Sequence, residues 1–263
     1  MKTRIISGIV MGVIVAAVLL IGMLWNPVII TLAISILAAG AAYELLHNAI
    51  GITSKPAIIG AGIYSSLAVF SINYTFWAYF TVGVLYFIYA VVIVLKNHKE
   101  FNIAKIAAVV FMPLGLSFAF VSLEGVINLA GGIYYLLLLL NFSSVCDMGA
   151  YFTGVTIGKH KLCPEISPKK TIEGAIGGIV SSMIVTVILT LCFKKSILLP
   201  VVLTIPFCVL GILGDLFASI IKRSVDLKDY GNLIPGHGGI LDRVDSILMI
   251  APPLFILISH GVL

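Results

Sequence analysis

Long apolar runs alternate with short polar breaks along almost the whole chain. Nine runs are long enough for helices of about membrane-spanning length, and Pro, Gly, Asn or charged residues separate them. The pattern therefore predicts an all-α, polytopic integral membrane protein with about nine transmembrane helices. The predicted helices are residues 5–25, 27–46, 56–71, 74–95, 103–123, 133–152, 173–193, 197–221 and 244–259.

Composition excludes a soluble protein. Of the 263 residues, 60% are hydrophobic and 10% are charged, and the mean hydropathy is +1.18. A soluble domain carries about 25% charged residues. The first apolar run is also longer than the roughly 7 to 15 residues of a signal-peptide core, so we expect it to be a retained span.

The basic residues test the number of spans independently. In a nine-span arrangement, only Lys194 and Lys195 of the 16 Lys and Arg residues fall on the side opposite the N-terminus, which leaves 14 on the N-terminal side. Cytoplasmic loops are enriched in Lys and Arg. The count predicts a cytoplasmic N-terminus, an outside C-terminus and a location in the cytoplasmic (inner) membrane.

The small net charge of +5 is concentrated on that one side. It suits anionic lipid headgroups and phosphates, and it disfavours nucleic-acid binding. The four cysteines form no CxxC pair, so we expect them to be reduced, and no His/Cys cluster indicates zinc.

Acidic residues divide the chain into two parts. Eight of the eleven lie from Asp147 onward, and the two longest polar stretches, 154–172 and 222–243, both fall on the predicted cytoplasmic side. We predict a transmembrane scaffold over 1–127 and a catalytic membrane region over 128–263. Glu44 and Glu124 are expected to snorkel or to pair with a nearby lysine.

One predicted helix carries a polar stripe. Asp215, Ser219, Lys222 and Arg223 are spaced i, i+4, i+7 and i+8, which places them on a single helical face. The rest of that helix is apolar. A carboxylate leading up to a cationic pair fits a site where a metal-bound phosphate lies beneath a basic rim.

The next helix begins with two carboxylates one turn apart. Asp242 and Asp245 are spaced i, i+3, so both can face the same ion. Oxygen ligands of this kind suit magnesium, which takes one or two carboxylates together with water and substrate phosphate. Between the helices, the glycine-rich turn 235–239 can bring backbone amides close to an anion, and His237 can donate to a phosphate.

The stretch from Ser219 to Asp245 resembles the signature of phosphatidate cytidylyltransferases, the CDP-diacylglycerol synthases. The resemblance extends to residues 147–154, 158–159 and 167–174, and so covers roughly the C-terminal half. It implies that CTP and phosphatidate react at the membrane to give CDP-diacylglycerol and pyrophosphate. It also implies a magnesium ion with a potassium ion nearby, and it is compatible with a homodimer.

The residues and the resemblance together assign roles. We expect Asp215, Asp242 and Asp245 to be the metal ligands, with Asp147 and Asp229 as second candidates. The expected catalytic residues are Asp215, Ser219, Lys222, Arg223, Lys228, Asp229, His237, Asp242, Arg243 and Asp245. The expected substrate-binding residues are Asp147, Lys159, Ser167, Lys169, Lys170, Thr171, Glu173, Gly238 and Gly239.

Other readings of the sequence remain open. A CTP-dependent polyprenol kinase or a cytidylyltransferase for ether lipids would use the same nucleotide and related lipid chemistry. A secondary transporter would place its carboxylates near the middle of the membrane with inverted repeats, whereas these acids crowd one side. A purely structural membrane protein would have no use for the polar cluster.

Overall fold

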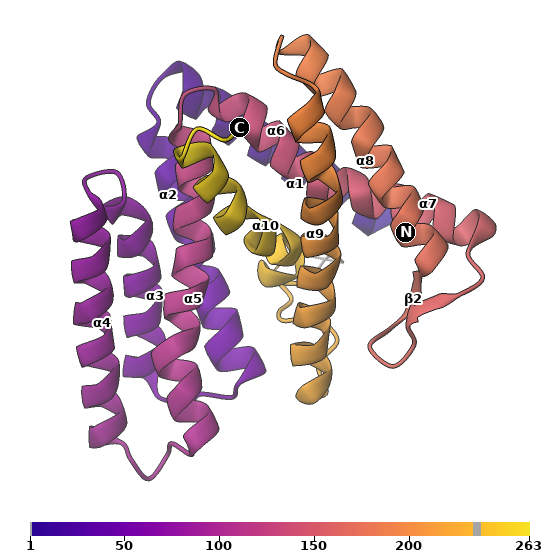
Figure 1. Cartoon of the computed structure of the whole chain (residues 1–263). Coiled ribbons are helices and arrows are strands. Elements are labelled where there is room, and N and C mark those ends of the chain that lie inside the picture. Colours follow the sequence, from indigo (N-terminus) through magenta and orange to yellow (C-terminus); the bar gives the residue numbers. More distant parts are fainter. Residues whose placement is uncertain (1, 234–237) are drawn as a thin grey trace. The chain divides into compact units, whose positions relative to one another are not determined.

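The computed structural model describes residues 2–233 and 238–263, and helices dominate it (Figure 1). Two segments are π-helices, η1 and η2, and one short antiparallel hairpin interrupts the helices. The elements are α1 (Lys2–Leu24), α2 (Val28–Tyr43), η1 (Glu44–Ala49), α3 (Lys55–Ser71), α4 (Phe76–Lys96), α5 (Ile103–Asn128), α6 (Gly132–Leu140), η2 (Asn141–Val145), α7 (Cys146–Ile157), β1 (Lys161–Cys163), β2 (Ser167–Thr171), α8 (Ile172–Cys192), α9 (Leu198–Ser224) and α10 (Leu241–Ser259).

Each of the nine predicted spans coincides with a helix or a run of joined helices. Among the described residues, six helices are long and apolar enough to cross a membrane. They are Val28–Ala49, Phe76–Lys96, Ile103–Asn128, Gly132–Ile157, Ile172–Cys192 and Leu198–Ser224. The helical membrane fold is thus confirmed, whereas the crossing of α1, α3 and α10 stays a prediction.

The chain divides into two compact units. The first unit comprises Met1–Gly125 and Val225–Arg243, and the second comprises Val126–Ser224 and Val244–Leu263. The first boundary lies close to the predicted one at 127/128. The units differ from the predicted domains in one respect, because residues 225–243 pack with the N-terminal helices.

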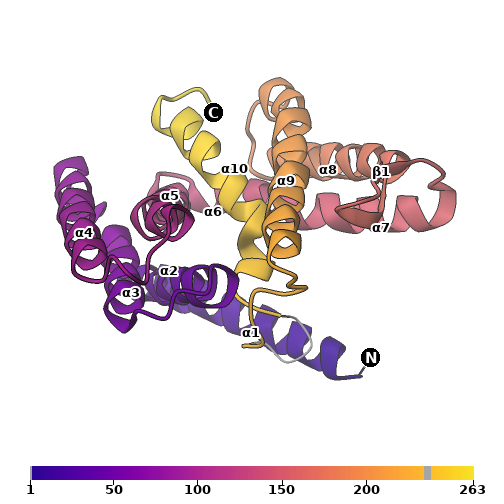
Figure 2. The same ribbon diagram turned by 90° about the horizontal axis from the view of Figure 1, so that it is seen from below.

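Tyrosine and serine side chains join the helices of the first unit, where α3, α4 and α5 lie side by side (Figures 1 and 2). The hydroxyl of Tyr64 on α3 lies 2.7 Å from that of Ser117 on α5. Tyr86 on α4 stacks on Tyr64 and donates to the Val109 carbonyl at 2.6 Å. These bonds satisfy polar atoms within an apolar bundle, where an unpaired group is costly.

Glycines bring α7 and α8 of the second unit close together (Figure 2). A Cβ atom at Gly178 would lie 2.5 Å from the Cys146 carbonyl oxygen, and one at Gly174 would lie 2.7 Å from that of Ala150. Small residues are what allow two membrane helices to approach backbone to backbone. These glycines therefore serve the close packing of α8 against α7.

The two π-helices lie next to acidic residues, where η1 ends the helix that begins with α2 and η2 joins α6 to α7. The segment η1 begins at Glu44, and η2 ends one residue before α7, which carries Asp147 in its first turn. A π-turn rotates the side chains that follow it, and such turns are frequent at functional sites. Neither π-helix was predicted from the apolar pattern.

The predicted polar loop 154–172 contains regular structure. Helix α7 continues to Ile157, and β1 then pairs antiparallel with β2, with Lys161 opposite Thr171 and Cys163 opposite Ser167. The all-α prediction therefore needs one correction, a two-stranded hairpin that leads directly into α8.

Candidate active site

Three carboxylates and two lysines form a cluster within the second unit. Asp147 on α7 and Asp245 on α10 each repel Asp215 on α9, and they also repel each other. Lys170 at the end of the hairpin attracts Asp147, and Lys222 on α9 attracts Asp245. The structure thus brings together five residues that are far apart in the sequence.

The closest contact in this cluster is the ion pair between Lys170 and Asp215. The Lys170 Nζ atom lies 2.5 Å from Asp215 Oδ2, and the two side chains are 24% and 30% exposed. Such a charge-assisted contact is strong because both partners are ionised and partly shielded from water. Lys170, predicted to bind substrate, is therefore the counterion of a predicted metal ligand.

Helix geometry explains why these carboxylates meet. Asp147 lies ten residues before the end of α7, and Asp215 lies nine residues before the end of α9. At about 1.5 Å per residue, both lie roughly 14–15 Å inside their helices. At Gly214 a Cβ atom would lie 3.0 Å from the Asp245 carbonyl oxygen, so α10 passes close to α9 beside Asp215.

Glu173 fixes the hairpin that carries Lys170. Its carboxylate accepts hydrogen bonds from the backbone N–H groups of Lys159 at 3.0 Å and His160 at 3.1 Å. The His160 Nδ1 atom lies 2.6 Å from the other oxygen. In the described structure, Glu173 thus binds the backbone just before β1 and stabilises the hairpin. Its pairing with His160 was not predicted from the sequence.

Thr171 joins the hairpin to α8. Its hydroxyl accepts from the Gly174 N–H at 3.1 Å and thereby caps the helix. The other predicted substrate-binding residues of this region, Lys159, Ser167 and Lys169, lie before β1 or on β2. Lys159 and Lys169 are exposed.

Asp242 closes the loop 225–243 within the first unit. Its Oδ2 atom accepts from the N–H of Tyr230 at 2.8 Å and of Gly239 at 2.9 Å. Gly238 has φ = +82°, a conformation that favours glycine, and its Cα faces the side chains of Asp242 and Asp229. Asp242 therefore organises the loop as well as being a predicted metal ligand.

Glu44 binds the other side of the same loop. Its Oε1 accepts from the Ile240 N–H at 2.9 Å and its Oε2 from the Leu241 N–H at 3.0 Å. The side chain is buried, so the expectation that Glu44 snorkels is wrong. Glu124 is buried too and accepts a hydrogen bond from Thr31, so it does not snorkel either.

These bonds change the role of the predicted anion-binding turn. The amides of Gly239, Ile240 and Leu241 already donate to carboxylates of the protein itself. The phosphate contacts predicted for Gly238 and Gly239 stay predictions, and residues 234–237, which include His237, lie outside the described residues.

The remaining predicted residues are basic or hydroxyl side chains on α9, in the loop after it and at the start of α10. Lys222 is buried near the end of α9, whereas Arg223, Lys228 and Arg243 are exposed, and Ser219 is half-buried one turn after Asp215. Long basic side chains at such positions can reach phosphate oxygens.

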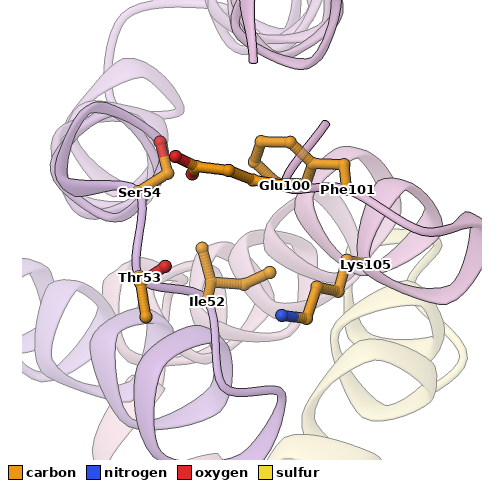
Figure 3. A pocket seen from close by; sticks show the side chains of 6 residues that line it. All are labelled: Ile52, Thr53, Ser54, Glu100, Phe101 and Lys105. Carbon is orange, nitrogen blue, oxygen red and sulfur yellow. The ribbon is translucent and has the colours of Figure 1, made fainter. Parts of the chain in front are cut away.

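A small polar pocket lies elsewhere in the first unit. Figure 3 shows the Glu100 carboxylate directed toward Ser54, with the Lys105 ammonium on the far side of Ile52. The Lys105 Nζ atom donates to the Gly51 carbonyl at 3.3 Å. No predicted site residue lines this pocket.

No three Asp, Glu, His or Cys side chains within residues 2–233 and 238–263 converge closely enough to hold a metal ion. The donor chemistry nevertheless fits a hard cation. Asp147, Asp215 and Asp245 repel one another, and a positive charge among them relieves that repulsion. Lys170 and Lys222 supply part of that charge in the structure described here.

The fold and this cluster together define a helical membrane protein whose polar site suits phosphate groups. A family model described as the cytidylyltransferase family matches residues 2–260, so the chain belongs to that family. Relatives named phosphatidate cytidylyltransferase, from Bacillus subtilis and Staphylococcus haemolyticus, are each 34% identical over 98% of this chain. The match covers 98% and 99% of those two proteins.

A further relative of that name, from Staphylococcus saprophyticus, is 43% identical over 129 residues, which are 48% of this chain and 50% of its own. The resemblance stated from the sequence is thus confirmed at the level of the family.

Proposed function

We propose that this protein transfers the cytidylyl group of CTP to phosphatidate, which gives CDP-diacylglycerol and pyrophosphate for phospholipid synthesis. The observation that carries the proposal is the 34% identity, over 98% of the chain, to relatives named for this activity. The signature-like stretch from Ser219 to Asp245 supports it independently of overall identity.

The reaction joins two anions. A phosphate oxygen of phosphatidate attacks the α-phosphorus of CTP, the bond between the α-phosphorus and the bridging oxygen breaks, and pyrophosphate leaves. Catalysis of such transfers depends mainly on positioning and on neutralising charge. Lys170 and Lys222 already lie among the carboxylates of the second unit, and Arg223 follows Lys222 at the end of α9.

The residues that would hold a divalent cation are Asp215, Asp245 and Asp242, the last lying one turn before Asp245 on α10. Magnesium is the expected ion, with a potassium ion nearby, and when bound it would supply positive charge to phosphate oxygens of CTP. Lys222, Arg223, Lys228 and Arg243 would bind the phosphates of CTP or of the lipid. Ser219 would donate a hydrogen bond to a phosphate oxygen.

The membrane arrangement is part of the proposal. Nine spans, a cytoplasmic N-terminus and an active site at the cytoplasmic face of the inner membrane would bring cytosolic CTP to a lipid headgroup. The 14 to 2 division of Lys and Arg supports this orientation. Cysteine labels introduced into the loop 225–233 should react from the cytoplasmic side only, and labelling only from outside would refute it.

The decisive experiment uses purified full-length protein in detergent micelles with labelled CTP. With magnesium and phosphatidate, we expect equal amounts of CDP-diacylglycerol and pyrophosphate, and chelation should stop both. Parallel reactions with a polyprenol and with an ether-lipid phosphate test the related activities that share CTP. Failure to form a liponucleotide with any divalent cation would contradict the proposal, and a homodimer can be tested on the same sample by its mass.

A further inference from the structure

The loop 225–243 is held by two carboxylates that approach it from different parts of the chain. Asp242 belongs to the loop itself, whereas Glu44 lies 196 residues before Ile240 on the helix formed by α2 and η1. Four backbone N–H groups, those of Tyr230, Gly239, Ile240 and Leu241, donate to the two carboxylates.

The loop backbone also packs closely against the Glu44 carboxylate. A Cβ atom at Gly231 would lie 2.7 Å from Glu44 Oε1, and one at Gly239 would lie 2.5 Å from both carboxylate oxygens. A side chain at either position would therefore displace the Glu44 carboxylate from its place against the loop. Neither glycine has positive φ, so close approach and not backbone conformation explains them.

A second side chain on η1 completes the attachment. Asn48, one π-helical turn after Glu44, donates from Nδ2 to the Tyr230 carbonyl at 2.7 Å. Glu44 thus binds the end of the loop that enters α10, while Asn48 binds its middle. The π-turn beginning at Glu44 is the backbone feature that sets the directions of the two side chains.

We infer that Glu44, assisted by Asn48, is a positioning residue that holds the described parts of the loop, residues 225–233 and 238–243, in the arrangement that the reaction needs. The inference rests on the proposed function, because it is the loop's Lys228, Asp242 and Arg243 that are proposed to act on the substrates. Both carboxylate oxygens of Glu44 accept hydrogen bonds from backbone amides of the loop. Glu44 therefore acts through the loop and not directly on the substrate.

Isosteric substitution tests this role of Glu44. Glu44→Gln keeps one acceptor oxygen but turns an amide N–H₂ toward a backbone N–H, and Glu44→Ala removes both acceptors. Each lost charge-assisted bond should lower kcat by about tenfold or more, so we expect about 10- to 100-fold for Gln and a larger loss for Ala. Asp242 still holds Tyr230 and Gly239, so the KM for CTP should change less than about threefold.

Glu124→Gln is the matched control, because Glu124 is a wholly buried glutamate of the same unit. Its partner Thr31 lies thirteen residues before Glu44, and thus about 20 Å away along α2. We expect this variant to keep the wild-type kcat. Thermal unfolding of all variants in the same detergent separates loss of folded protein from loss of the contact between Glu44 and the loop.

Hydrogen exchange gives a readout that needs no substrate. Amides in 238–243 should exchange at least about tenfold faster in Glu44→Gln than in wild-type protein, whereas α4 should be unchanged and Glu124→Gln should resemble wild type. Unchanged loop exchange, an unchanged kcat, or a kcat loss no greater than that of the control would each overturn the inference. If wild-type protein makes no CDP-diacylglycerol, the proposed function fails while the exchange result still decides whether Glu44 holds the loop.

Discussion

Two groups of carboxylates in this protein occupy opposite kinds of environment. In the first unit, Glu44 and Asp242 have backbone N–H donors at 2.8–3.0 Å. In the second unit, Asp147, Asp215 and Asp245 repel one another, and lysine side chains lie close to them. Of these three, Asp245 also accepts a hydrogen bond from a backbone N–H, that of Ser246 at 2.7 Å. Hydrogen bonds from backbone amides thus balance the negative charges of the first group, whereas lysine side chains balance much of the negative charge of the second group.

This difference in environment suggests that one group of carboxylates positions a loop, while the other group takes part in binding the reacting groups. Backbone amides are fixed donors, so a carboxylate bound to several of them stabilises one loop conformation. Carboxylates that face one another raise the free energy of the folded protein through their repulsion until a cation binds between them. A lysine that pairs with such a carboxylate can turn to a phosphate group instead when the substrate binds. We therefore propose that Glu44 serves the loop structure alone and that the second group binds cations and phosphates. Asp242 would serve both, because it holds the loop and is also a proposed metal ligand.

The largest effect is expected from Asp245→Asn. Loss of one negative charge from the mutually repelling group should weaken cation binding and lower kcat by about 10³-fold or more, while the neutral, isosteric side chain leaves the helix intact. Steady-state assays over a magnesium titration measure both effects. Wild-type turnover at low magnesium would remove Asp245 from the proposed site.

A smaller loss is expected from Lys170→Gln, which leaves Asp215 without its ion-pair partner. Removing one charged contact to a phosphate or carboxylate should lower kcat/KM for CTP by about 10- to 100-fold. Lys170→Arg keeps the positive charge and should therefore retain part of the kcat/KM that the Gln variant loses. Equal activity of the Gln and Arg variants would show that the charge at this position is not used.

Glu173→Gln tests whether the hairpin needs its own carboxylate anchor. The variant loses the charge-assisted bonds to the backbone at 159–160 and to His160, and Lys170 should become less well positioned. Because the hairpin pairing and the Thr171 cap remain, we expect a loss of only about threefold to tenfold in kcat/KM. Limited proteolysis within 161–171 should accelerate in parallel, and unchanged cleavage would contradict the anchoring role.

The smallest catalytic effect should come from Thr31→Val, which breaks the buried contact to Glu124. A lost buried hydrogen bond should lower the free energy of unfolding by about 1–3 kcal/mol. The kcat should stay at the wild-type value, because this contact belongs to neither the loop nor the lysine cluster. A selective loss of activity without destabilisation would place Glu124 in the mechanism.

The positions of the helices were largely predictable because apolar length and breaking residues act locally. Five site residues of the second unit were also predicted: Asp215 and Lys222 from one helical face, Asp245 from its pairing with Asp242, and Asp147 and Lys170 from the family resemblance. The role of Glu44 in holding the loop was not predicted, because its hydrogen bonds are not local in the sequence. The partners of Glu44 lie 196 and 197 residues away, and backbone amides leave no mark in a sequence.

A signal for Glu44 nevertheless existed. An ionisable residue in an apolar helix is expensive, and it is therefore a functional hypothesis by default. Glu44 lies in the continuous apolar segment Val28–Ala49 and is buried there. Treating it as a snorkelling residue ignored this cost. The hairpin was missed because β1 has three residues and β2 has five, too short for an alternating pattern to stand out.

The sequence by itself determined the helical membrane character, the approximate limits of the helices, the asymmetry of charge and the family resemblance, because all of these depend on local composition or on the order of residues. Only the tertiary structure decided which charges meet. It paired Lys170 with Asp215, and it closed Glu44 and Asp242 on backbone amides, because these contacts depend on how the packed helices direct side chains toward one another.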